Sequence, residues 1–350
     1  MKINVFDTDP RKISEPEVHK TNMGSFGIVA DLFNKGLKEI GCYAEPDEAD
    51  YVGICDGINF AFKYKDKKPF LIHVWDMANV LPIELRIMQR SFNMKMVGLS
   101  NQVSNLWSKY GVECKTAMPG CDTSFYKPIS QKDVVSFNKE EGKFTFLFES
   151  ALNVRSGLDM AIEAFSMAFG DRKDVQLIIK AVNFNPLLEK WLNTFIEKGV
   201  NLKLISGRFS FSQMRELYNY ADVTLHVYRH SSWGLGIHQA AACGSQVLVG
   251  DFCPSNEMGA IHKITPKETK IIEILPKLVN ELGLSNAYGP FNYDEDPTWY
   301  DYDLNDYAKK LLYLSENRDI FGGAALFQYD FISDKFSLKK CAEKLVEALK

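Results

Sequence analysis

The residues best suited to chemistry lie between positions 220 and 250, in the segment YADVTLHVYRHSSWGLGIHQAAACGSQVLVG. An apolar run ends at Arg229 and His230, and a glycine-bearing turn then leads into a helix of small residues. Such a turn brings the unpaired N–H groups of a helix start to the carboxyl end of a strand, where a diphosphate can bind. The spacing alone also fits a turn that only packs a helix close to a sheet, and both interpretations stay open at this point.

Apolar runs alternate with segments of helical periodicity along the whole chain, as is typical of parallel sheets with crossover helices. Strands are expected at residues 2–6, 50–55, 69–75, 94–100, 114–118, 144–149, 175–180, 201–205, 223–228 and 246–251. Helices are expected at residues 26–40, 82–92, 101–110, 157–169, 186–198, 211–220, 236–243 and 268–282, with several more between 302 and 350. Residues 118–128 contain proline and glycine without helical periodicity, so they are predicted to link two domains.

This pattern predicts an α/β protein with two doubly wound domains that face each other across a cleft. The expected boundaries are residues 1–125 for the N-terminal domain, 126–325 for the C-terminal domain and 326–350 for the C-terminal helices. Doubly wound sheets bind ligands at the carboxyl ends of their strands, so the active site is expected in the cleft.

Composition excludes several classes of protein. The chain has 350 residues, of which 46% are apolar and 25% charged, as in ordinary globular proteins of about two domains. Its 41 Lys and Arg against 45 Asp and Glu leave no global basic surface for a polyanion. No apolar run approaches the roughly 18 residues that span a bilayer, so a soluble, cytoplasmic protein is expected. Seven scattered cysteines indicate reduced thiols, and His226 and His230, about 13 Å apart on a predicted strand, do not form a metal site.

The segment 220–250 resembles the donor-site motif S-x-x-E-G-F-G-L-P-x-x-E-A-M-A-C-G-x-P-V-I of the family 4 retaining glycosyltransferases. Matching or similar residues are Trp233, Gly234, Leu235, Ala240, Ala242, Cys243, Gly244 and Val247. Residues 99–128 resemble the family's strand, helix and P-N-G-V-D-x-x-x-F-x-P linker, and residues 157–165 resemble its K-G-L-D-x-L-I-E-A-F helix. The resemblance covers roughly residues 90–345. It implies the GT-B fold of two Rossmann-like domains, an acceptor domain at residues 1–125 and a nucleotide-sugar donor domain at residues 126–325, with the C-terminal helices packing back toward the N-terminal domain.

The resemblance also implies which residues form the site. Donor binding falls to Ser231, Ser232, Trp233, Gly234, Leu235, Gly236 and Gln239. Gly24 and Gly27 occupy the place of a glycine-rich turn that approaches the donor phosphate or the acceptor, and a flexible loop is the alternative there. His73 and Asp76 stand where the family has a strand ending in His-Asp, so they are candidates for positioning the acceptor or shielding an oxocarbenium ion. A structural role is the alternative for His73.

The departures from the motif concern charge. The family's two glutamates, seven residues apart, are replaced here by Ser231 and Gln239. Gln239 can still bond ribose hydroxyls, whereas Ser231 is too short for the same reach. The family's Gly-Arg turn and Lys correspond to Ser150, Ala151 and Ser156. Arg155 is therefore the candidate cation for the diphosphate, with Arg208, Arg229 and His230 as further candidates; a solvated surface charge is the alternative for Arg155.

The resemblance implies retaining transfer of a sugar from a nucleotide sugar, by default a UDP-sugar, without a metal or other cofactor. The expected acceptor is a sugar, a small molecule or a lipid-linked glycan. One alternative is a phage-type enzyme that glycosylates hydroxymethylated DNA bases, with the basic residues 63–68, Lys339 and Lys340 on phosphates. A second is a non-catalytic relative that binds a nucleotide or glycan, because both carboxylates are missing. A third is an unrelated ligand-binding protein with doubly wound domains.

Overall fold

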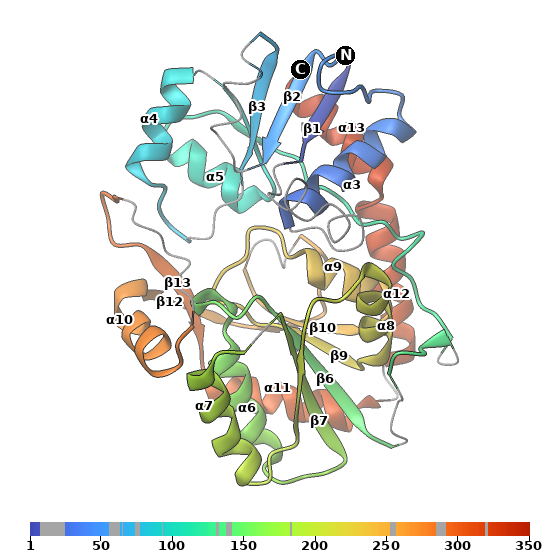
Figure 1. The fold of residues 1–350 in the computed structure, drawn as a ribbon, viewed down its shortest axis with the longest axis vertical. Helices are drawn as coiled ribbons and strands as arrows, with labels where there is room; N and C mark the ends of the chain where they lie inside the picture. The colour runs from blue at the N-terminus through green and yellow to red at the C-terminus, as the bar shows by residue number, and fades with distance from the viewer. Residues whose placement is uncertain are drawn as a thin grey trace.

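The computed structural model describes residues 1–350 except 8–24, 56–63, 65, 74–77, 93, 131–132, 138–141, 183, 253–256, 285–291 and 319–320, and omits the side chains of 88, 92 and 321–325. Two parallel sheets face each other within one chain (Figure 1). None of the helices in these ranges combines the length and the apolar character that a bilayer crossing requires.

The N-terminal sheet is parallel, with the order β1-β2-β3-β4-β5. Its strands are β1 (Ile3–Phe6), β2 (Tyr51–Cys55), β3 (Lys68–His73), β4 (Lys95–Gly98) and β5 (Cys114–Thr116). Helix α3 (Ser25–Glu39) leads from β1 to a short parallel bridge between Ile3 and Tyr43. Ile3 bonds residues 42 and 44 on one edge of β1, whereas the carbonyl of Lys2 accepts from residue 50 on the other edge. The winding direction therefore reverses at β1, which makes this domain doubly wound.

Successive side chains of a strand point to opposite faces of the sheet, so their contacts show which helices cover each face of the N-terminal sheet. Phe70 and Ile72 of β3 pack in the cluster that contains Phe33 of α3, whereas Leu71 packs in the cluster that contains Trp107. Trp107 belongs to α5 (Asn101–Lys109), which follows α4 (Ile83–Phe92) and β4. The sheet is therefore buried on both faces, as its near-continuous apolar strands predict.

The C-terminal sheet is also parallel, with the order β11-β10-β9-β6-β7-β8. Its strands are β6 (Phe144–Glu149), β7 (Val175–Ala181), β8 (Leu202–Ser206), β9 (Val223–His226), β10 (Gln246–Gly250) and β11 (His262–Ile264). The crossovers contain α6 (Leu158–Phe169), α7 (Pro186–Glu197), α8 (Phe211–Tyr220) and α9 (Leu235–Ala242). The strand order reverses between β6 and β9, so the crevice in which doubly wound sheets bind ligands opens at the carboxyl ends of these two strands.

The helix predicted at residues 268–282 begins later than expected, so the prediction of its start is wrong. Residues 266–270 form β12 (Pro266–Lys270), which pairs antiparallel with β13 (Thr298–Tyr302) and places Thr269 opposite Trp299. The helix begins only at α10 (Ile271–Pro276) and continues as a π-helical turn, η4 (Lys277–Glu281). The Lys and Glu residues of this segment favour a helix. Pairing with β13, whose Trp299 is fully buried, overrides that local preference.

Three helices end the chain: α11 (Leu304–Glu316), α12 (Phe321–Lys335) and α13 (Leu338–Leu349). Helix α11 packs on α6 and α12 packs on α9, whereas α13 packs on α3 of the N-terminal sheet (Figure 1). A Cβ at Gly36 would lie 2.3 Å from the carbonyl oxygen of Leu338, so only glycine allows this approach of α3 and α13. The last helix therefore returns to the N-terminal sheet, as expected.

A second connection joins the two halves on the opposite side, where the chain enters β13. The backbone N–H of Ile83 donates to the carbonyl of Asn292, and that of Thr298 donates to the side chain of Asn79. Arg86 pairs with Asp294 at 2.9 Å. The two halves are thus joined at both ends of the region between the sheets.

Candidate functional site

The carboxyl ends of β6 and β9 meet at the point where the strand order reverses. The hydroxyl of Tyr228 donates to the carbonyl of Glu149, which ties the segment after β9 to the last residue of β6. That segment, residues 227–234, then leads into α9. This is the strand, turn and small-residue helix that the sequence singled out.

Gly234 is the N-cap of α9 and adopts φ +80°. A Cβ there would lie 3.1 Å from Nε2 of His226, so both the positive φ and the close approach call for glycine. Within the part of the chain that the structure describes, no side chain caps this helix. Gly234, Leu235 and Gly236 are partly exposed, so the start of α9, which carries a partial positive charge, lies partly at the surface.

Arg155 lies in the single 3-10 turn after β6, η3 (Val154–Ser156), which Asn153 caps. Its Nη1 donates to the carbonyl oxygen of His230 at 2.9 Å and so crosses from the β6 side to the β9 side. Burial, together with the charges of Arg155 and His238, lowers the pKa of His226 to about 3. His226 is therefore neutral near pH 7, and the guanidinium of Arg155 supplies the positive charge beside it.

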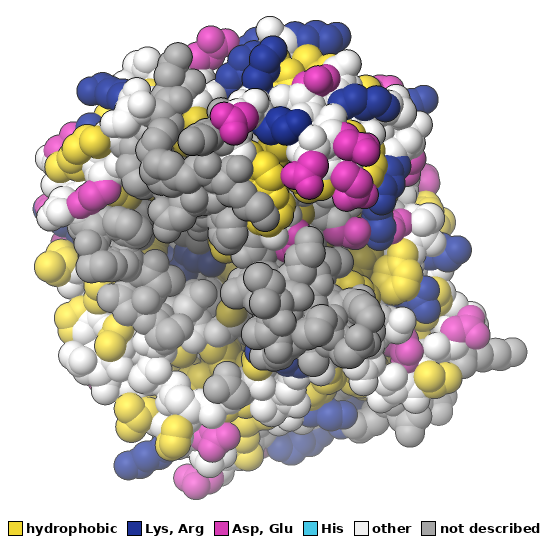
Figure 2. Space-filling model, turned by 45° about the horizontal axis from the view of Figure 1, so that its top comes forward, with side chains coloured by type: hydrophobic (Ala, Val, Ile, Leu, Met, Phe, Trp, Pro, Cys, Tyr) yellow, Lys and Arg dark blue, Asp and Glu magenta, His cyan; other side chains and the backbone are white. Residues whose placement is uncertain are grey.

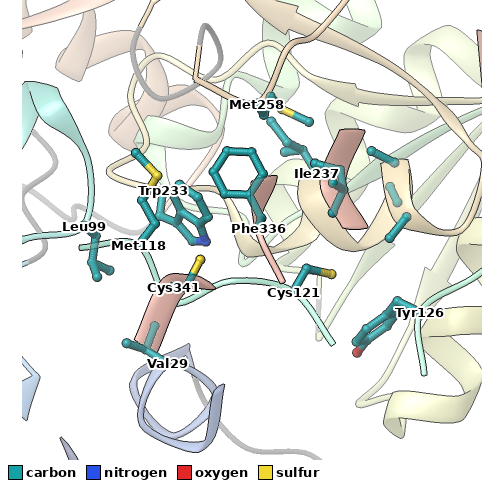
Figure 3. Close-up of a cluster of buried hydrophobic side chains, with 14 of the residues drawn as sticks. Val29, Leu99, Met118, Cys121, Tyr126, Trp233, Ile237, Met258, Phe336 and Cys341 are labelled. Carbon is teal, nitrogen blue, oxygen red and sulfur yellow. The ribbon is translucent and has the colours of Figure 1, made fainter. Parts of the chain in front are cut away.

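Trp233 anchors the turn in the interior. It is 3% exposed and stacks on His238 with ring centroids 3.9 Å apart. Phe336, from the junction of α12 and α13, meets it edge-on at 5.4 Å, and Figure 3 shows Met118 and Cys341 close to the same ring. This cluster joins the turn before α9 to the linker and to the C-terminal helices. Trp233 is thus built into the contact between the two halves of the molecule.

Arg229 is not available as a cation for a ligand. Its guanidinium forms two hydrogen bonds with Asp159 of α6, at 2.8 and 2.7 Å, and both side chains are 3% exposed. Despite burial, the charge of Asp159 raises the pKa of Arg229, and Arg229 keeps the pKa of Asp159 low. The interpretation of Arg229 as a candidate diphosphate ligand is therefore corrected: it holds the segment after β9 onto α6.

A cavity of about 330 Å³ lies between the N-terminal half and helices α8 and α9. Its wall consists of Ile28, Asp31, Leu32, Lys35, Asp122, Phe125, Tyr126, Ser210, Phe211, Ser212 and Gln239. Lys35 pairs with Asp31 at 3.0 Å and with Asp122 at 3.2 Å. Gln239 lies four residues after Leu235, so about 6 Å of helix axis separates the start of α9 from the cavity wall. The cavity and the helix start are thus neighbours.

The other predicted site residues are more scattered. His73, at the end of β3, is fully buried, and its Nδ1 accepts from Nε1 of Trp107 at 3.0 Å. Gly27 is buried in the first turn of α3, and Arg208 is exposed in the loop between β8 and α8. Ser231 and Ser232 are buried before the turn, at 6% and 2% exposure. Gly24 and Asp76 lie outside the described residues.

Two charged residues at the strand ends were missed by the sequence reasoning. Glu149 ends β6 and Lys180 is the next-to-last residue of β7, and the two are partners in the parallel register. Each directly follows an apolar run, in FTFLFE and VQLIIK. A charge that ends a buried strand of a doubly wound sheet points toward the ligand crevice, and this signal was available in the sequence.

Comparison with known proteins identifies the fold. No family model matches the sequence, and no curated protein does. HepE of Anabaena in complex with UDP superimposes with TM-score 0.65 at 16% identity, over 99% of this chain and 91% of that one. A glycosyltransferase from Rickettsia africae gives 0.63 at 14%, over 99% and 90%. Sucrose-phosphate synthase from Thermosynechococcus elongatus gives 0.63 at 9%, over 96% and 79%. The chain therefore has the GT-B fold, two Rossmann-like domains facing each other, as predicted.

Proposed function

We propose that this protein is a glycosyltransferase that takes a sugar from a nucleoside-diphosphate donor bound between its two domains. The observation that carries the proposal is the uncapped, half-exposed start of α9, with Arg155 held beside it and a cavity one helical turn away. The helix start and the guanidinium suit a diphosphate. The cavity, lined by Gln239, suits the attached nucleoside.

UDP is the first donor nucleotide to test. Solved structures of HepE, which shares this fold, contain UDP or UDP-glucose. Gln239 offers an amide that both donates to and accepts from ribose hydroxyls. The cavity wall adds the aromatic rings of Phe125 and Phe211, against which a base can pack.

The proposed reaction is retaining transfer without a metal ion. The acceptor hydroxyl attacks the anomeric carbon from the face that the nucleotide leaves, the C–O bond to the diphosphate breaks through an oxocarbenium-like transition state, and the hydroxyl proton passes to the departing diphosphate oxygen. Arg155 and the N–H groups at the start of α9 stabilise the negative charge that develops on the departing diphosphate. His73 is assigned a structural role, because its burial and its bond to Trp107 fix the ring within the N-terminal core.

The acceptor is proposed to be a hydroxyl of a sugar, a small molecule or a lipid-linked glycan. Two lysines considered for contact with DNA are engaged elsewhere: Lys67 donates to the carbonyl of Asp47, and Lys340 pairs with Asp334. Figure 2 shows Lys and Arg interspersed with Asp and Glu on the face that it presents. Such mixed charge does not favour the DNA alternative.

The test is thermal stabilisation by a panel of nucleoside diphosphates and nucleotide sugars, followed by hydrolysis of the best donor without acceptor. A ligand at about 100 times its Kd adds about 2.7 kcal/mol to folded-state stability. We expect a shift with one base and slow release of free sugar. A shift without hydrolysis would favour a non-catalytic nucleotide-binding relative, and no shift with any nucleotide would refute the proposal.

A further inference from the structure

Glu149 and Lys180 place opposite charges side by side at the carboxyl ends of β6 and β7. They are register partners in a parallel pair, so their side chains leave the sheet on the same face. Against the larger effect of burial, the charge of Lys180 acts to lower the pKa of Glu149, and the charge of Glu149 acts to raise the pKa of Lys180. Within the described part of the chain, however, they form no ion pair with each other.

Among the residues that the structure describes, neither charge has a countercharge in contact with it. Lys180 is only 7% exposed, and its ammonium lies 5.2 Å from the ring centre of Phe209. Glu149 is half-buried. Among the described residues, neither the ammonium nor the carboxylate has a hydrogen-bond partner. Burial raises the pKa of Glu149 and lowers that of Lys180, so the site disfavours both charges. Charged groups kept in such surroundings are typical of functional sites.

The pair spans the space between the two parts of the proposed donor site. Oε2 of Glu149 lies 2.9 Å from where a Cβ on Gly236 would stand, so the carboxylate rests against the first turn of α9. Phe209, beneath Lys180, directly precedes Ser210 and Phe211 of the cavity wall. A donor with its diphosphate at α9 and its nucleoside in the cavity would cross this pair.

We infer that Lys180 binds the donor diphosphate and that Glu149 accepts hydrogen bonds from hydroxyls of a donor sugar ring. An ammonium buried without a partner favours a phosphate, and a carboxylate is an acceptor that hydroxyl donors satisfy. The pair would thus supply, from the ends of β6 and β7, the charges missing at Ser156, Ser231 and Gln239. This inference rests on the proposed function and assigns the donor contacts of that same site.

The test compares affinities measured by titration calorimetry with UDP, uridine, 2′-deoxy-UDP and UDP-glucose, or with the matching set for whichever base the stabilisation panel selects. The variants are Lys180→Met, Glu149→Leu and the milder Glu149→Gln. The controls are Lys203→Met and Glu189→Gln, exposed residues of β8 and α7. Circular dichroism shows whether each variant is folded.

Lys180→Met is expected to weaken the binding of UDP about 10- to 100-fold and the binding of uridine less than about 2-fold. Glu149→Leu is expected to remove a binding preference that the wild type shows. If Glu149 bonds the ribose, the lost preference is for UDP over 2′-deoxy-UDP. If it bonds the transferred sugar, the lost preference is for UDP-glucose over UDP. Glu149→Gln should keep part of that preference.

Two results would overturn this inference, and they are distinguishable. If the wild type binds a nucleotide and the folded variants match their controls, the assignment of Glu149 and Lys180 is wrong while the proposed function stands. If the wild type binds no member of the panel, the proposed function fails and the inference fails with it.

Discussion

Nη1 of Arg155 donates a 2.9 Å hydrogen bond to the carbonyl oxygen of His230, and so links the turn after β6 to the segment after β9. A bond to a neutral carbonyl leaves the positive charge of the guanidinium uncompensated by that contact. The link therefore does two things at once. It fixes the segment that leads to Gly234, and it holds a cation near the start of α9.

Arg155→Ala is expected to weaken binding of the donor nucleotide about 10- to 100-fold, because it removes a charge-assisted contact to the diphosphate. Titration with UDP measures the effect. Arg172→Ala is the matched control, since Arg172 is exposed in the turn before β7 and pairs there with Asp174. Equal affinities of the two variants would show that Arg155 only braces the loop.

Gly234→Ala is expected to destabilise the protein by about 1 to 3 kcal/mol and to abolish nucleotide binding. Two effects add: the positive φ of +80°, and a Cβ 3.1 Å from Nε2 of His226. Gly41→Ala isolates the first effect, because Gly41 has φ +70° with nothing within 4 Å of its Cβ position. Urea unfolding compares the two variants. A loss no larger than that of Gly41→Ala would mean that the crowding at His226 is relieved by a small shift.

Most of the fold could be predicted from the sequence. Buried parallel strands are short apolar runs, and the strand at residues 144–149 and the helix at residues 211–220 were predicted at their observed bounds. The antiparallel pair β12 and β13 was missed, because the polar residues 266–270 pair with a strand some 30 residues away, and such long-range pairing leaves no local pattern.

The site was predicted only in part, and for a physical reason. The turn at Gly234 is a local feature, so its strand, glycine and helix are visible in one segment. The engagement of Arg229 by Asp159, and the approach of Glu149 to Gly236, join residues 70 and 87 positions apart. Only the folded chain shows which cation is neutralised and which carboxylate reaches the helix start.

Asp159→Asn is expected to destabilise the protein by about 3 kcal/mol, because it removes the nearer countercharge of the buried Arg229 and leaves only Asp301, at 3.4 Å. The low pKa of Asp159 adds a dependence on pH. Its contribution is fully present above the pKa of an unfolded aspartate and is lost as the pH falls through the folded value. Urea unfolding near neutral pH measures the effect.

The exposed pair Arg172 and Asp174 provides the control for this prediction, with side chains 41% and 53% exposed. Asp174→Asn should cost no more than about 1 kcal/mol. Similar losses for the two variants would contradict the assignment of Arg229 to a buried structural pair.

Glu149→Gln is expected to raise the Tm near pH 7 by about 1 to 2 °C, the shift that about 1 kcal/mol produces in a chain of 350 residues. The pKa of Glu149 is raised in the folded protein, so the folded state takes up protons more readily than the unfolded state. The ionised carboxylate therefore costs stability at neutral pH, and the cost fades as the pH falls through the folded pKa. The advantage of the variant should thus be largest near pH 7 and shrink toward about pH 5.

The groups that face Glu149 support the expectation that its ionised carboxylate lowers the stability of the folded protein. Its cationic neighbour is Lys180, which has no hydrogen bond or ion pair among the described residues. Burial and the charge of Glu149 raise the pKa values of the Tyr218 and Tyr228 hydroxyls. The tyrosines remain neutral over the range tested. Differential scanning of wild type and variant from about pH 8 to about pH 5 checks the trend. A variant that is less stable at neutral pH would show that Glu149 is a net stabilising partner of Lys180, rather than a charge held in place for a ligand at a cost in stability.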